Sequence, residues 1–138
     1  MDRKEVLDKL QSYAYHRARL REARAQYISI TYKTTPTYGN LAGASGGNNS
    51  SKVEDMGNRR IDLETKIKNH NAKVEEVRRM IQKSGLDDRE KRLLWWLANN
   101  GKLQVFARRE HIGKDNVYKM RDRAIDKVIA AEKTRNVV

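Results

Sequence analysis

Five residues near the C-terminal end of the sequence carry side chains that can hydrogen-bond to the edges of nucleic-acid bases. They stand within six consecutive positions: Lys114, Asp115, Asn116, Tyr118 and Lys119. A lysine can donate to guanine O6 and N7, an asparagine can pair with adenine through two hydrogen bonds, and an aspartate can accept from cytosine N4. These residue types at this spacing predict a surface that reads base edges in duplex DNA.

A second group of basic residues flanks these five and suits contacts with phosphate oxygens: Lys102, Arg108, Arg109, Arg121 and Arg123. Phosphate contacts fix the register of a protein on DNA but carry no base information directly. We therefore expect this group to hold the duplex while the first group reads it.

The apolar residues around both groups are spaced as in a helix-turn-helix: Leu103, Phe106, Ala107, Ile112, Val117, Met120, Ala124 and Val128. A small residue, Ala107, stands where the two helices would cross, and Ile112 would anchor the turn. Gly113 is a plausible N-cap for the reading helix, whose free N–H groups favour a phosphate. The alternative is an ordinary helical hairpin with a charged, solvated face.

A further helix is predicted ahead of this motif. Gly85 ends a preceding helix, and Asp87 and Asp88 offer N-cap chemistry for a helix from Arg89 to about residue 100. Gly101 is predicted as its C-cap. Helices over about 102–110 and 114–132 complete a three-helix domain over residues 85–138, with a dense apolar set in its core: Leu86, Leu93, Leu94, Trp96 and Leu97. Trp95 is expected to be partly exposed.

Residues 1–84 show two series with alternating spacings of three and four, which is typical of helices that pair along a narrow seam. The first runs from Asp2 to about Thr31, with Arg17 and Arg24 interrupting these apolar or aromatic residues: Val6, Leu10, Tyr13, Leu20 and Tyr27. The second is Val53, Met56, Arg60, Leu63, Ile67, His70, Val74, Val77 and Ile81. Two long helices are therefore predicted.

The segment between them, about residues 32–51, holds the only proline and a Gly-Gly-Asn-Asn-Ser-Ser run, and is predicted to be a flexible loop. A loop of this length lets the two helices fold back as an antiparallel, coiled-coil-like hairpin for oligomerisation or partner docking. A parallel or swapped assembly of several chains remains the alternative. The narrow seams favour self-association in either case, with a homodimer through the N-terminal helices as the simplest form.

The composition agrees with an all-α protein that meets polyanions. Lys and Arg number 30 against 18 Asp and Glu, which gives a formal net charge of +12. Such a field draws nucleic acid, although basic surface also keeps small proteins soluble. The absence of cysteine excludes disulfides, thiolate catalysis and Cys-based zinc sites. No apolar run reaches the roughly 18 residues of a membrane span. We expect a cytoplasmic protein without a membrane anchor.

No catalytic or metal-binding constellation emerges from the sequence. His16, His70 and His111 lack the i, i+3 or i, i+4 spacing that places two ligands on one helix face. No Ser, His and Asp grouping or phosphate loop can be assembled either. We therefore expect neither enzymatic activity nor a cofactor.

The stretch from Phe106 to Ala124 resembles region 4 of bacterial sigma factors, most closely in Arg123-Ala124-Ile125 and in the spacing from Ile112 to Met120. The whole layout is similar to phage late-gene transcription regulators of the ArpU and RinA type. The resemblance implies promoter binding in a phage or prophage and activation of late genes, with the host RNA polymerase as a second partner. By position, it carries the DNA contacts over to Lys114, Asp115, Asn116, Tyr118 and Lys119.

The sequence departs from the sigma pattern at two places. Arg108 and Arg109 replace a usual acidic pair, and Gly113 replaces a usual Ser or Thr cap. Both departures bear on which operator would be recognised. Two other functions remain open from the sequence: a DNA packaging protein resembling a terminase small subunit, and a helical protein-interaction adaptor.

Overall fold

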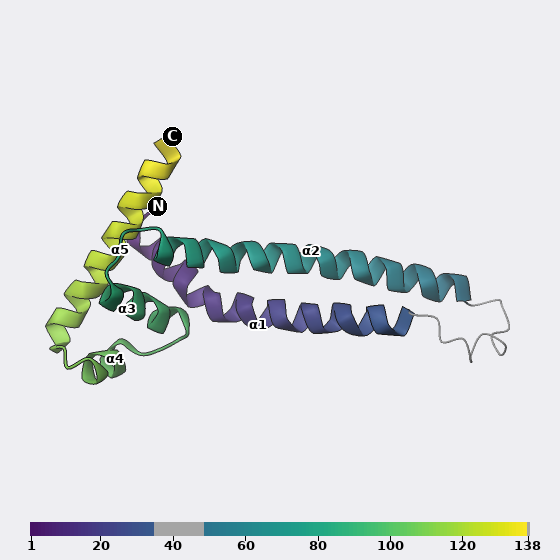
Figure 1. The fold of residues 1–138 in the computed structure, drawn as a ribbon, viewed down its shortest axis with the longest axis horizontal. Helices are drawn as coiled ribbons and strands as arrows, with labels where there is room; N and C mark the ends of the chain where they lie inside the picture. The colour runs from purple at the N-terminus through teal and green to yellow at the C-terminus, as the bar shows by residue number, and fades with distance from the viewer. Residues whose placement is uncertain (35–48, 138) are drawn as a thin grey trace. The chain divides into compact units, whose positions relative to one another are not determined.

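The computed structural model describes residues 1–34 and 49–137, most of which lie in helices (Figure 1). The helices are α1 (Arg3–Thr34), α2 (Asn49–Gln82), α3 (Asp88–Ala98), α4 (Leu103–Arg109) and α5 (Lys114–Val137). No strand occurs in these ranges, so the predicted all-α class is confirmed. Among these residues, no helix combines the length and the apolar character that a bilayer span requires.

Helices α1 and α2 extend into both ends of the segment predicted as a flexible loop, about residues 32–51. Residues 32–34 continue α1 and residues 49–51 belong to α2. The rest of that prediction, residues 35–48, lies outside the described residues.

Internal contacts divide the chain into two units. The larger unit combines Met1–Arg17 with Ala72–Val138, and the smaller unit is Ala18–Asn71. This division falls at other residues than the one predicted after residue 84. The reason is that the start of α1 contacts the C-terminal helices: Tyr13 meets Trp95 of α3 edge to face at 5.4 Å, and Arg3 pairs with Asp126 of α5 at 2.8 Å.

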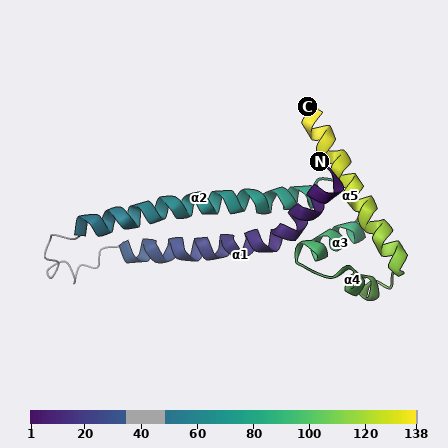
Figure 2. The same ribbon diagram turned by 180° about the vertical axis from the view of Figure 1, so that it is seen from behind.

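Each unit holds a stretch of α1 beside a stretch of α2 (Figures 1 and 2). In the larger unit Lys9 pairs with Glu76. In the smaller unit the Tyr27 hydroxyl donates to Glu64 at 3.1 Å, and Arg60 lies over the Tyr27 ring. The described members of both apolar series are buried or half-buried, with Arg24 as the exception. The three-and-four spacing therefore identified the faces that these helices bury.

The start of α3 is fixed by a capping box. The Asp87 side chain accepts from the Glu90 backbone N–H at 2.7 Å, and the Glu90 side chain accepts from the Asp87 N–H at 3.2 Å. These bonds satisfy N–H groups that a helix start leaves without partners. Glu90 is buried and also accepts from the Lys127 ammonium of α5 at 2.6 Å, so the cap links α3 to α5.

Helices α3, α4 and α5 pack around a shared apolar core. Its buried members are Leu93, Phe106, Ala107 and Val117, and partly buried side chains close it: Trp96, Leu97, Leu103, Ile112 and Met120. Trp96 packs against this core, as predicted, but is only half-buried, and Trp95 is half-buried, in agreement with the partial exposure expected.

The turn between α4 and α5 spans residues 110–113. His111 adopts a positive φ of 55°, and the Ile112 N–H donates back to the Ala107 carbonyl at 2.8 Å. Val117 N–H then donates to the Gly113 carbonyl at 3.0 Å, which makes Gly113 the residue from which α5 starts. This turn directs Ile112 toward the core while α5 leaves in a new direction.

Two glycines behave differently from one another. Gly85 has a φ of 68° and lies three residues beyond Gln82, the last residue of α2, close to where the sequence predicts the helix end. Gly101 is not the left-handed cap of α3, because Asn100 adopts that conformation with a φ of 63°. Gly101 instead allows close approach: a Cβ there would stand 2.3 Å from the Trp96 Nε1.

Candidate nucleic-acid interface

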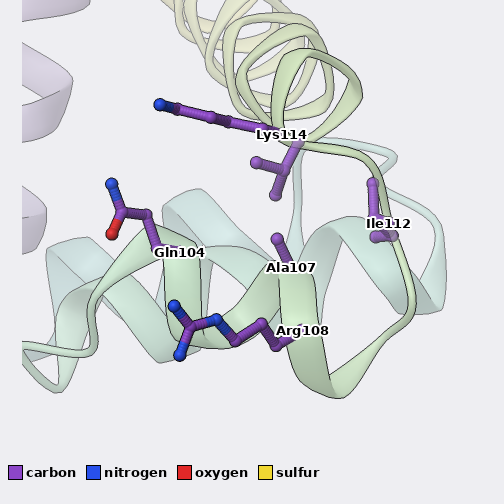
Figure 3. A pocket seen from close by; sticks show the side chains of 6 residues that line it. Gln104, Ala107, Arg108, Ile112 and Lys114 are labelled. Atoms are coloured by element: carbon purple, nitrogen blue, oxygen red, sulfur yellow. The ribbon is translucent and has the colours of Figure 1, made fainter.

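A groove between α4 and the start of α5 carries polar side chains on an apolar floor (Figure 3). Its volume is about 300 Å³, and it is lined by Gln104, Ala107, Arg108, Ile112, Lys114 and Val117. Figure 3 shows the polar ends of Gln104, Arg108 and Lys114 directed to one side of the groove. The lining includes two cations and no carboxylate, so the side chains that line the groove attract a negatively charged ligand.

The five predicted base-reading residues are all exposed on the first turns of α5. The structure nevertheless distributes them over more than one side of the helix. Lys114 and Tyr118 are four positions apart, so they share the side next to the groove, whereas Asn116 points roughly 160° away from Tyr118. The Asn116 amide nitrogen lies 3.6 Å from where a Cβ at Gly113 would stand.

Tyr118 has a cationic neighbour on its own helix. The Arg121 guanidinium lies 5.1 Å from the centre of the Tyr118 ring and also pairs with Asp122 at 3.2 Å. A cation over an aromatic face and a carboxylate together limit the rotamers that Arg121 can adopt. Arg121 therefore supports Tyr118 beside the groove.

Lys119 and Arg123 lie in a different hollow of α5. That hollow also includes Asp122, Asp126 and Lys127. The Arg3 guanidinium donates to both carboxylate oxygens of Asp126, at 2.9 and 2.8 Å, and this hydrogen bonding holds the pKa of Asp126 below its usual value. Acids and bases alternate here, so this side of α5 is electrostatically weaker than the groove.

The five predicted phosphate contacts do not form one surface. Arg108 lines the groove, whereas its neighbour Arg109 lies over the Trp96 ring at 5.3 Å on another side of α4. Successive residues on a helix point about 100° apart, so adjacent arginines serve different surfaces. Lys102 is exposed at the start of α4, where its carbonyl accepts from the Trp96 Nε1–H at 2.8 Å.

Sequence reasoning missed Gln104, which lines the groove four residues before Arg108. The i, i+4 spacing could have revealed it, because residues four apart share a helix face. It also missed Arg3, whose contacts with Asp122 and Asp126 join positions far apart in the sequence.

Within the described ranges, no three His, Cys, Asp or Glu side chains gather as a metal-binding group. Comparisons with protein-family models, curated proteins and solved structures found no match to this chain. The assignment of function therefore depends on the chemistry of the groove and of α5.

Proposed function

We propose that this chain binds duplex DNA through a helix-turn-helix formed by α4 and α5, with α3 as the supporting helix. The observation that carries the proposal is the carboxylate-free groove, where Gln104, Arg108 and Lys114 direct their polar ends to one side. Paired stretches of α1 and α2 support the second part of the proposal, an antiparallel hairpin for dimerisation or partner docking.

The docking follows from the two helices that form the groove. The start of α5 would enter the major groove, because the first turns of a recognition helix reach the base edges. Lys114 and Tyr118 would face the bases beside the protein groove, and Asp115 and Lys119 would read the adjacent positions. Arg108 and Gln104 would contact phosphates as α4 crosses the backbone.

We propose other roles for some of the remaining predicted contacts, from the side chains that lie beside them. Arg121 would support Tyr118, and Arg123 would give up its phosphate contact because it lies beside Asp122 and Asp126 in the other hollow. Lys119 lines that hollow too, and its proposed base contact rests on its exposure near the start of α5. Asn116, on the opposite side from Tyr118, is the member of the reading group with the weakest geometric support. We keep Lys102 as a phosphate contact, since it is exposed at the start of α4.

The biological role we propose is sequence-specific transcription regulation in the cytoplasm of a bacterial host. This role rests on the resemblance of residues 106–124 to sigma region 4 and of the chain's layout to phage late-gene regulators. Activation at a phage or prophage promoter, with contact to RNA polymerase, is the form that the resemblance implies. The chain itself would perform no chemical reaction.

The deciding experiment is selection of bound duplexes from a random pool at about 150 mM salt, where non-specific phosphate binding is weakened. We expect one defined motif, and a symmetric motif with half-sites about 10 base pairs apart would indicate that two copies act together. If only sequence-independent binding remains, or none, the proposed function is wrong.

Variants separate the roles within the groove. Arg108→Ala should weaken binding to all duplexes to a similar extent, while Lys114→Ala and Lys119→Ala should relax the preference at particular positions, by roughly 1–3 kcal/mol for a good base contact. Lys133→Ala, exposed near the end of α5, is the matched control and should change neither quantity. Equal effects of all four variants would show that binding depends on net charge alone.

A further inference from the structure

A second hollow lies on another side of α4 and involves none of the residues of the DNA groove. Its volume is about 500 Å³, and we call it the aromatic hollow. The main residues that line it are Arg92, Trp95, Trp96, Phe106, Arg109 and Glu110. It combines large apolar rings with guanidinium groups, a composition enriched where proteins bind other proteins.

The rings of the aromatic hollow are held in place by their own contacts. The Trp96 Nε1–H donates to the Lys102 carbonyl, and the Trp96 ring lies at a tilted angle to Phe106 with centroids 6.3 Å apart. Trp95 packs edge to face against Tyr13. Because each indole already has an aromatic or cationic partner, these rings form fixed apolar walls and not open platforms for stacked bases.

The charges around the hollow are unequal. Arg89 and Arg92 both approach the single carboxylate of Glu110, at 3.9 and 3.1 Å. Arg109 lies over Trp96, and among the described residues it has no carboxylate partner. Three guanidinium groups and one carboxylate give the rim of the hollow, formed by Arg89, Arg92, Arg109 and Glu110, a net positive charge. Arg109 can therefore pair with a further anion.

We propose that the aromatic hollow binds an acidic segment of a partner protein. Apolar side chains of that segment would contact the exposed parts of Trp95 and Trp96, and a carboxylate of the segment would pair with Arg109, since Arg92 already donates to Glu110. The positive rim supplies the charge complementarity, and the fixed rings supply apolar area at low entropic cost. Since Arg108 and Arg109 serve different sides of α4, DNA and this partner would bind at the same time. The peptide site does not depend on the DNA proposal.

The probe is a fluorescein-labelled peptide of about 14 residues, four helical turns, built from Glu, Leu and Phe with the apolar residues on one face. A matched peptide with Lys in place of Glu keeps the apolar pattern and reverses the charge. In fluorescence anisotropy with the full chain at about 150 mM salt, we expect the acidic peptide to bind at least about tenfold more tightly.

Arg109→Gln and Arg108→Gln form a matched pair, because they remove the same charge from adjacent positions of one helix. We expect Arg109→Gln to raise the dissociation constant of the acidic peptide by about fivefold or more and to leave duplex binding unchanged. Arg108→Gln should leave peptide binding unchanged and weaken duplex binding. Equal loss of peptide binding in both variants would overturn the proposal, because it would indicate attraction by net charge only.

Nuclear magnetic resonance locates the binding site directly. The acidic peptide should shift the indole N–H signals of Trp95 and Trp96, which a Trp95→Phe variant assigns, and leave the backbone signals of Lys114 and Asp115 in place. Two outcomes would contradict a protein-binding hollow. One is a shift of the Lys114 signal without a shift of the indole signals. The other is that a single-stranded oligonucleotide displaces the peptide and itself shifts the indole signals. A failed duplex selection would leave these peptide results unaffected, so the two proposals can fail separately.

Discussion

The two units differ most in how many apolar side chains they enclose. In Ala18–Asn71, the buried apolar residues among those described are Leu20, Ala23 and Leu63, and Ile28 and Ile61 are more than half exposed. In the larger unit, α1, α2, α3 and α5 each contribute fully enclosed side chains, among them Leu10, Met80, Leu93, Leu94, Ile125 and Val128, and α4 contributes the buried Phe106 and Ala107. The difference indicates that the larger unit supplies most of the folding free energy and keeps the surfaces of α4 and α5 rigid.

The sharpest test of this contrast replaces one buried leucine in each unit. Leu93→Ala should lower the free energy of unfolding by about 3–5 kcal/mol, because Leu93 has no exposure and its truncation leaves a cavity among packed side chains. Leu63→Ala should cost no more than about 2 kcal/mol, since a narrow two-helix seam relaxes more easily. Urea denaturation followed by circular dichroism measures the first, and hydrogen exchange within residues 55–71 measures the second. Equal losses would remove the distinction between the units.

Glycines provide a second test, beginning with the larger unit. Gly101→Ala should destabilise by about 1–3 kcal/mol, the usual cost of overpacking. The added Cβ would stand 2.3 Å from Trp96 Nε1, and the indole cannot retreat without losing its hydrogen bond to the Lys102 carbonyl. Thermal unfolding gives the loss, and the Trp96 indole N–H signal should move. An unchanged midpoint would show that the ring is not fixed.

Gly101 also shows where sequence reasoning stops. The helix end close to Gly85 was predicted correctly, because helix termination is local chemistry. After α3 the chain offers Asn100 and Gly101 in succession, and either residue type tolerates a positive φ. The choice depends on Trp96, whose ring needs the space over Gly101. That contact is tertiary, so the sequence alone misassigned the cap.

Prediction from sequence has the same limit, the tertiary contact, at the exposed surfaces of the helices. The helices, the Asp87 cap and the apolar faces could be predicted because spacing and local hydrogen bonds determine them. The separation of Arg108 from Arg109 follows from helical geometry and was available, although adjacent basic residues invited one shared role. The Arg3 contact with Asp126 was not available, since 123 positions separate the two residues in the sequence.

In the smaller unit a glycine should behave in the opposite way. Gly57 lies inside α2, and nothing stands within 4 Å of a Cβ built there. Gly57→Ala should therefore stabilise the helix by up to about 1 kcal/mol, the difference in helix propensity. Slower hydrogen exchange in residues 55–71 would register the gain. A loss of stability would reveal a neighbour that needs this position to be small, and would weaken the description of the smaller unit as sparsely packed.

The capping box of the larger unit predicts a pH dependence. The hydrogen bond from the Glu90 backbone N–H holds the pKa of Asp87 below its usual value. A depressed folded-state pKa contributes stability above the ordinary aspartate range near pH 4, and that stability is lost as the pH falls through the folded-state pKa.

Asp87→Asn keeps a capping acceptor but removes the charge. At pH 7 it should lower the free energy of unfolding by less than about 1 kcal/mol, because solvent screens an exposed carboxylate. At a pH well below the folded-state pKa of Asp87, the variant and the parent should unfold at the same urea concentration, because both caps are then neutral. Asp126 also has a lowered pKa through Arg3, but it titrates in both proteins and cancels. A difference that persists in acid would contradict the capping explanation.

The smallest effect is expected at the start of α5, where stability and binding can be separated. A side chain at Gly113 would meet only the Asn116 amide, at 3.6 Å, and Gly113 already accepts the first hydrogen bond of the helix. Gly113→Ser should stabilise by a few tenths of a kcal/mol, because its hydroxyl can cap a free N–H group. Gly113→Asp should stabilise at least as much, since a negative charge is also favourable at a helix N-terminus.

The two variants should differ in duplex binding. The serine variant should bind as the parent does, and the aspartate variant should bind more weakly, because it places a carboxylate beside Lys114 in a groove whose lining otherwise has none. If the aspartate variant bound duplex DNA as well as the serine variant, the start of α5 would not be where the duplex approaches.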